Sequence, residues 1–252
     1  METLAQQLEQ AAITGKVATP REINLLHIHR FLAGERQFDF GVKLTRDWDY
    51  DSVFQLMVNA CGINPDPDFT EGVDTISTQR CIEQLDLMRS AIQDVASRGG
   101  RILFATGHPS GLLPVHVRMR KWAVSLGGRT VEQTDFVPVE IGGDARTVLG
   151  VWVWHQHGGL PHTHLAEPAQ AVLEKVETPD LVVADHGWAG AAGSVGIRTV
   201  GFADCNDPAL FVAQAQEQVE VCVPLDDNIP PHLYEPLIAH VCRVPRACSM
   251  WN

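Results

Sequence analysis

Short apolar runs recur through the second half of the chain, each ending in glycine, histidine or acidic residues. The clearest are residues 181–184 and 198–203, and similar runs occupy 102–105, 148–154 and 219–223. A strand buried on both faces of a sheet is apolar throughout its length. Segments at 112–126, 168–176 and 232–241 have the composition and spacing of helices. Strands that alternate with single helices predict a parallel sheet with right-handed crossovers.

The first part of the chain has a different, helical pattern. Thr19 and Pro20 are typical of a helix start, Asp51 is placed to cap a second helix, and a long apolar stripe runs to Ser97. Arg98-Gly99-Gly100 predicts the end of that helix. We therefore expect a helical N-terminal region at 1–98 and an α/β catalytic domain at 99–252 with a loose tail from residue 243. The predicted fold class is α/β, with a parallel-sheet, three-layer, Rossmann-like core after the helical segment.

Acidic side chains follow two neighbouring strands of the predicted sheet. Asp185 ends one run, and Asp204, Asn206 and Asp207 follow the next. Ligands of open α/β sheets bind at the carboxyl ends of the strands, and oxygen donors suit hard cations. These four residues are therefore candidate metal ligands. In the alternative interpretation, Asp207-Pro208 caps the next helix and Asp204 closes a turn.

A glycine-rich loop between a strand and a helix is a candidate anion site. Gly107 and Gly111 bracket His108 and Ser110, so the backbone can approach a phosphate at the helix N-terminus. The alternative is an ordinary strand-to-helix turn. Neither the Walker loop nor the dinucleotide-binding pattern is present.

Four histidines follow the run at 148–154, and three polar residues follow the last strand. His155, His157, His162 and His164 form two pairs in which alternate side chains point the same way, so each pair can grip a metal such as zinc. Histidine-rich loops also bind substrate phosphates or sugar hydroxyls without a metal, and we expect these four to contact substrate. Asp226, Asp227 and Asn228 are equally consistent with added ligands and with ordinary turn chemistry.

Composition narrows the functional classes. The chain of 252 residues is 45% hydrophobic with a formal net charge of −12, which fits a globular protein and argues against broad binding to nucleic acids or anionic membranes. No apolar run approaches the roughly 20 residues of a membrane span. The polar N-terminus lacks the features of a secretory signal, and six scattered cysteines favour reduced thiols. We expect a cytoplasmic protein that can form a homo-oligomer.

Four segments together resemble a family of actinobacterial phosphatases: FATGHPSGLL, HQHGGLPHTH, DHGWAGAAGSVGIRTVGFADCNDPAL and VPLDDNIPP. The resemblance covers roughly residues 101–240 and implies phosphatase activity. The layout is also similar to that of metal-dependent damage-control phosphatases. Where an Asp-Asn pair is expected in those proteins, this chain has Asp185-His186.

The leading functional hypothesis is a metal-dependent phosphomonoesterase acting on a small, sugar-phosphate-like metabolite. Mg²⁺ or Mn²⁺ is the expected cofactor, with Zn²⁺, Co²⁺ or Ni²⁺ as alternatives. We expect Asp185, His108 and His186 to be catalytic, with either histidine as the acid for the leaving alcohol. A sugar-phosphate isomerase or lyase, and a non-enzymatic metabolite- or metal-binding protein, are the alternatives.

Overall fold

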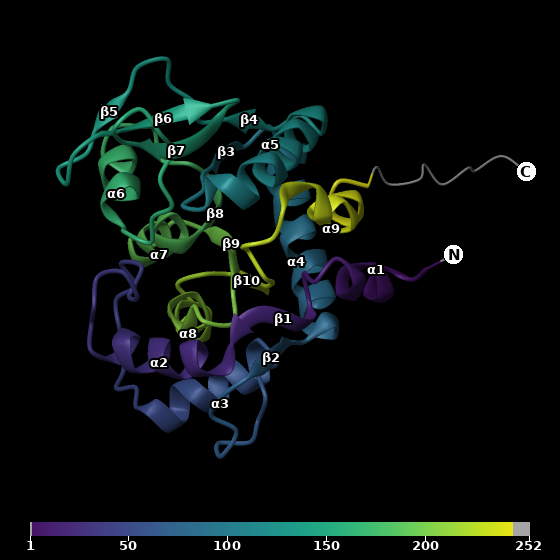
Figure 1. Cartoon of the computed structure of the whole chain (residues 1–252). Coiled ribbons are helices and arrows are strands. Elements are labelled where there is room, and N and C mark those ends of the chain that lie inside the picture. The colour runs from purple at the N-terminus through teal and green to yellow at the C-terminus, as the bar shows by residue number, and fades with distance from the viewer. Residues whose placement is uncertain (1, 244–252) are drawn as a thin grey trace, which may run out of the picture.

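The computed structural model describes residues 2–243, and a parallel sheet forms its centre (Figure 1). In these residues the five strands of the sheet lie in the order β10-β9-β8-β3-β4, and each neighbouring pair is parallel. The predicted parallel α/β sheet is thus confirmed. The more detailed assignment of a Rossmann-like, three-layer core stays a prediction. The strands are β3 (Arg101–Phe104), β4 (Arg129–Thr130), β8 (Leu181–Asp185), β9 (Thr199–Ala203) and β10 (Val221–Pro224).

The direction in which the chain builds the sheet reverses between β3 and β8. From β3 the chain moves outward to the edge strand β4, and it then returns to the other side of β3 to form β8, β9 and β10 in turn. Connections that leave two adjacent strands in opposite directions open a crevice at their carboxyl ends, where α/β proteins bind ligands. The fold therefore offers one favoured position for a site, beyond Phe104 and Asp185.

Helices cover the sheet on both sides because successive strand residues point to opposite faces. Ile102 and Phe104 of β3 belong to one hydrophobic cluster, whereas Leu103 belongs to the other. The first cluster includes residues of α1 (Leu4–Gln10), α4 (Thr78–Ser97), α5 (Pro109–Ser125) and α9 (Glu235–Val241), which follows the short helix η1 (Pro231–Tyr234). The second includes residues of α2 (Arg21–Leu32), α3 (Tyr50–Ala60), α6 (Glu167–Leu173), α7 (His186–Ser194) and α8 (Pro208–Ala215).

Helix α4 illustrates how the sequence pattern produces this packing. Its N-cap Ser77 accepts a hydrogen bond from the backbone N–H of Arg80. Its buried side chains are spaced four and three residues apart, so they form one stripe against the sheet. That stripe consists of Cys81, Leu85, Met88, Ile92 and Val95.

The N-terminal region is not helical throughout, which corrects the prediction. Strands β1 (Gly15–Pro20) and β2 (Val73–Ile76) form a small antiparallel sheet. Thr19 lies in β1 and does not cap α2, whose N-cap is Pro20. The hydroxyl of Thr19 instead donates a hydrogen bond to Asp204 Oδ2 at 2.6 Å. β1 therefore runs beside the carboxyl ends of the central strands. The division of the chain into domains at residue 98 stays a prediction.

The apolar segment 148–154 was also wrongly predicted as one strand of the parallel sheet. It is interrupted by a turn in which Leu149 and Gly150 have φ values of 52° and 79°. This turn joins two strands of a separate antiparallel sheet, since two residues with positive φ make a tight hairpin. That sheet has the order β5-β6-β7 and comprises β5 (Val137–Pro138), β6 (Asp144–Val148) and β7 (Val151–His155).

Two local predictions at helix ends have different outcomes: α4 ends at Ser97 as expected, whereas Asp49 caps α3 and Asp51 lies in its first turn. The predicted helices correspond to α5, α6 and α9 within a few residues. Within residues 2–243, no helix combines the length and apolar character needed to cross a membrane. The predicted loose tail lies outside the described residues, apart from Arg243.

Candidate functional site

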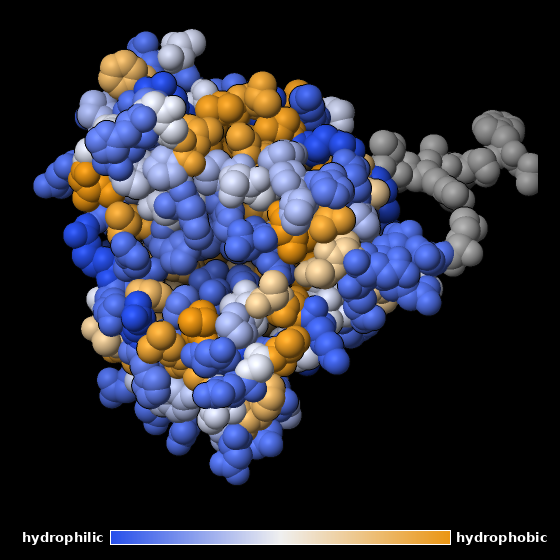
Figure 2. Space-filling view, in the orientation of Figure 1, coloured by the Kyte–Doolittle hydropathy of each residue, from blue (hydrophilic) through white to orange (hydrophobic). Residues whose placement is uncertain are grey.

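Acidic and histidine side chains gather where β3, β8, β9 and β10 end. His108 follows β3, Asp185 and His186 join β8 to α7, Asp207 follows β9, and Asp227 follows β10. All five residues are at most 5% exposed. The predicted location of the site, at the carboxyl edge of the sheet, thus matches the position to which the topology points. In the space-filling view, hydrophilic residues gather in the recessed middle of the face shown in Figure 2.

Asp185 is held by three hydrogen bonds. Its Oδ1 accepts from the backbone N–H of Gly107 and from His186 Nδ1, both at 2.7 Å. Its Oδ2 contacts His116 Nε2 at 3.1 Å. Burial alone would raise the pKa of this carboxyl, but the two histidines hold it well below its usual value. Asp185 is therefore a fixed anion that orients the imidazole of His186.

His186 occupies a strained turn between strand β8 and helix α7. Its φ of 47° lies in the left-handed region, which residues with a side chain rarely adopt. Because Nδ1 faces Asp185, Nε2 points to the other acids and lies 3.1 Å from Asp227 Oδ2 and 3.6 Å from Asp207 Oδ2. Burial opposes a charge on His186, yet the hydrogen bonds that its ring donates to Asp185 and Asp227 raise its pKa well above the ordinary value. The space around Nε2 thus favours positive charge.

Three more histidines surround His186. His164 stacks on it with ring centroids 4.5 Å apart, and His162 stacks on His108 at 4.2 Å. Potential ligand atoms of His164, His186 and Asp207 lie within 4.8 Å of one another, and so do those of His108, His162 and His186. Burial and the charge on His186 lower the pKa of His162 to about 4 and that of His164 to about 2. These two rings are consequently neutral at pH 7 and able to act as ligands.

The histidine-rich segment divides into two pairs with different positions. His162 and His164 reach the cluster around His186. His155 instead lies at the end of β7, where its Nδ1 contacts Asp144 Oδ2 at 3.3 Å. His157 is exposed in the following turn with a φ of 52°. The structure therefore does not bring His155 and His157 together with His162 and His164.

The glycine-rich loop makes close backbone contacts with the protein itself. A Cβ on Gly107 would lie 2.3 Å from the carbonyl oxygen of Thr163, and one on Gly111 would lie 2.7 Å from that of Asp227. The N–H of Gly107 is already bound to Asp185. Ser110 is exposed in the first turn of α5. In these positions the two glycines bring neighbouring loops of the site together, and the N–H of Gly107 is used within the protein.

The segment after β9 contributes residues in three different ways. Asp204 Oδ1 accepts from the N–H of Cys205, and burial together with the charge of Asp227 raises the pKa of the Asp204 carboxyl. Asn206 offers its backbone oxygen to His27 Nδ1 at 2.9 Å. Asp207 faces His186, and burial raises the pKa of its carboxyl to about 7. Among the four predicted metal ligands, all of which lie in the described residues, Asp207 alone has a side-chain contact with His186 Nε2.

Sequence reasoning missed two residues that shape the site. His116 lies two turns into α5, and nothing in the spacing of the sequence links it to Asp185. Phe40 comes from the N-terminal region, has a φ of 52°, and packs edge-on against His164 and His186 at 5.0 and 5.4 Å. The sequence is equally consistent with Asp227 as a ligand and as a turn residue, and in the structure it contacts both His186 and His108.

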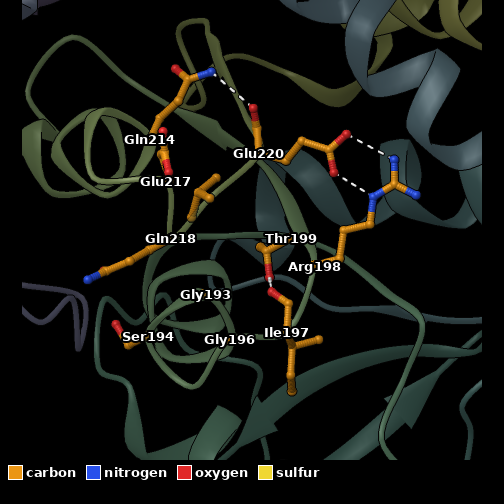
Figure 3. A pocket seen from close by; sticks show the side chains of 11 residues that line it. Gly193, Ser194, Gly196, Ile197, Arg198, Thr199, Gln214, Glu217, Gln218 and Glu220 are labelled. Atoms are coloured by element: carbon orange, nitrogen blue, oxygen red, sulfur yellow. Dashed lines mark hydrogen bonds and ion pairs between the residues drawn. The ribbon is translucent and has the colours of Figure 1, made fainter.

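Two cavities differ in their relation to this cluster. An open depression of about 300 Å³ is lined partly by His162 and His164. A larger one, of about 630 Å³, lies at the beginning of β9 and β10, where Arg198 pairs with Glu220 (Figure 3). Parallel strands place their two ends at opposite edges of the sheet, so the larger cavity is remote from the site.

Comparison with known proteins agrees with the resemblance. The model of a family described as Phosphatase matches residues 1–250. A phosphatase of Streptomyces coelicolor is 41% identical over 245 residues, which cover 94% of this chain and 93% of the relative. The match extends across the N-terminal region as well as the sheet. The chain therefore belongs to this Phosphatase family.

Proposed function

We propose that the protein is a metal-dependent phosphomonoesterase that acts on a small phosphorylated metabolite with a sugar-like leaving group. Membership of the family makes it a phosphatase and a hydrolase. Metal dependence and the class of substrate are the proposal. The observation that carries it is the position of His186. Asp185 binds its Nδ1, and Asp207 and Asp227 lie close to its Nε2.

The donor atoms fit a divalent cation. A metal-binding imidazole commonly donates one ring N–H to a carboxylate or carbonyl, which leaves the other nitrogen bare for the metal. His186 Nδ1 faces Asp185, and His164 Nδ1 faces the backbone oxygen of Gln37 at 2.9 Å. Within residues 2–243, His108 Nδ1 and Asp227 Oδ2 are also buried without a well-formed hydrogen bond, although Asp227 Oδ2 lies 3.1 Å from His186 Nε2. A cation would compensate the negative charge that otherwise raises the pKa of His186.

We assign His164, His186 and Asp207 as direct ligands, with Asp227 beside them. The proposal keeps Asp207 from the predicted ligands and gives Asp185 an orienting role. Asp204, hydrogen-bonded to Thr19 and Cys205, supports the loop that carries Asp207. Mixed imidazole and carboxylate donors suit Mn²⁺, Zn²⁺, Co²⁺ or Ni²⁺ better than Mg²⁺, which prefers oxygen. When bound, such an ion supplies charge neutralisation for phosphoryl oxygens and activation of water.

Helix dipoles favour a phosphate in the same place. α5, α7 and α8 begin directly after His108, Asp185 and Asp207, and none of these residues closes its helix with a side-chain hydrogen bond. The N-terminus of a helix attracts anions through its free N–H groups and its dipole. The N-termini of three helices therefore offset part of the repulsion between the carboxylates of the cluster and a phosphate ester.

His108 is the best-placed group to protonate the leaving alcohol. It is buried, stacks on His162, and has Nδ1 3.5 Å from Asp227 Oδ1. Asp227 therefore lies on the Nδ1 side of the ring and orients it, and a positioned imidazole is the commonest general acid in enzymes. His162 at the exposed edge would then relay protons to solvent.

The proposal is tested with purified full-length protein stripped of metal by a chelator. Phosphate release is measured from a panel of phosphorylated metabolites as Mg²⁺, Mn²⁺, Co²⁺, Ni²⁺ or Zn²⁺ is added in turn. We expect no release without a cation and restored release with at least one of them. Full activity in the stripped protein would refute metal dependence. Formation of an isomer without phosphate release would instead favour the isomerase alternative.

A further inference from the structure

The depression beside the histidine cluster has a wall that is polar but uncharged. Its lining consists of Gln37, Trp154, His162, Thr163, His164 and Leu165. Among the described residues, this lining includes no lysine, arginine, aspartate or glutamate. His162 and His164 belong both to the wall and to the cluster. A substrate whose phosphate reached His186 would therefore place its leaving group in this depression.

Gln37 is fixed at the rim by the segment around it. Its backbone oxygen contacts His164 Nδ1 at 2.9 Å. Three residues later Phe40 is buried and packs on His164 and His186, and Gly41 accepts a hydrogen bond from Ser194 in α7. The side-chain amide of Gln37 is exposed and has no hydrogen-bond partner among the residues that the structure describes. Because the backbone is anchored, only the side chain of Gln37 has to be ordered when its amide binds a ligand.

The other walls complete a surface suited to hydroxyl groups on a carbon frame. The Nε1–H of Trp154 is bound to the carbonyl of Gly142 at 2.9 Å, so its indole offers apolar surface to the depression. Leu165 adds further apolar surface. Small-molecule sites combine such surfaces with a few placed polar groups, and about 300 Å³ is at the small end of their range.

We propose that this depression is the subsite for an uncharged, polyhydroxylated leaving group, and that Gln37 sets its specificity by hydrogen bonding to a hydroxyl. The inference rests on the proposed function, because it takes the phosphate to lie at His186. It adds a residue of the N-terminal region to substrate recognition. A purely apolar leaving group would displace water from the amide without replacing its hydrogen bonds, and a charged one would lie against a wall without a charged partner. Both cost free energy.

The test compares phosphate release from glucose 6-phosphate and glycerol 3-phosphate with release from butyl phosphate, which has no free hydroxyl. kcat/KM is measured for the wild type, for Gln37→Ala, and for Gln55→Ala on the exposed surface of α3. We expect Gln37→Ala to lower the ratio of kcat/KM on a hydroxylated ester to that on butyl phosphate at least about 10-fold, chiefly through KM. Gln55→Ala should leave the ratio at the wild-type value.

Two results would overturn the inference: an unchanged ratio in Gln37→Ala, or a wild-type preference for butyl phosphate. A second measurement separates these from failure of the proposed function. Tryptophan fluorescence is followed while glucose 6-phosphate is added, and Trp154→Phe identifies the reporting side chain. If no ester releases phosphate, the proposed function is refuted. In that case a weaker Trp154 fluorescence response to glucose 6-phosphate in Gln37→Ala would still support binding of a hydroxylated ligand in the depression. An unchanged response would refute the subsite as well.

Discussion

Asp185 and His186 are adjacent in sequence, and their side chains are hydrogen-bonded to each other at 2.7 Å across a strand-to-helix turn. His186 has a left-handed backbone at this contact, with a φ of 47°. It directs Nε2 to Asp207 and Asp227, which come from two other strand ends. Backbone strain of this kind costs roughly 1–3 kcal/mol and persists where the surrounding structure holds it in place. The arrangement therefore favours a functional role for His186.

Asp185→Asn tests the orienting role of that carboxylate. The amide keeps the size of the side chain but removes the charge that holds His186 Nδ1 and His116 Nε2. Loss of such an outer partner typically costs roughly 10- to 100-fold in metal affinity or activity. We expect kcat/KM for phosphate release to fall by that amount. Asp68→Asn, in the exposed loop before β2, is the matched control; equal activity of the two variants would contradict the role.

Gly107→Ala tests the close approach of two loops. Its Cβ would lie 2.3 Å from the Thr163 carbonyl, so the loop that carries His162 and His164 must move. Overpacking of this kind typically destabilises a protein by roughly 1–3 kcal/mol. We expect a lower free energy of unfolding in urea, together with weaker activity. Gly159→Ala is the control, since its Cβ would meet nothing closer than 3.8 Å, and it should unfold like the wild type.

Much of the fold was predictable because its signals are local. The strands β8 and β9 are mostly apolar and are buried over every residue, and acidic residues at their carboxyl ends indicated the edge at which the site lies. The separation of His155 and His157 from the cluster was not predictable, because it depends on the turn at Leu149 and Gly150. That turn lies within the apolar run at 148–154, where the sequence pattern indicates a single strand. The contact of His116 with Asp185 joins residues 69 apart and exists only once α5 packs on the sheet.

Thr19→Val tests the contact between β1 and the carboxyl end of β9. The substitution keeps the branched shape but leaves the buried Asp204 Oδ2 without its hydroxyl donor. An unsatisfied buried polar group typically costs roughly 1–3 kcal/mol. We expect the midpoint of urea unfolding to fall accordingly, whereas Thr19→Ser retains the donor and most of the stability. Equal midpoints for the valine and serine variants would show that this hydrogen bond contributes little.

The most direct test of the proposed metal site is isothermal titration calorimetry of the metal-stripped protein with Mn²⁺ and with Zn²⁺, for the wild type and for His186→Gln. Circular dichroism and urea unfolding confirm that the variant is folded. We expect saturable binding to the wild type and an affinity at least about 10-fold lower in the variant, because the loss of one ligand costs more than about 1.4 kcal/mol. Equal affinities in two folded proteins, or no binding of either ion to the wild type, would contradict a metal site at His186.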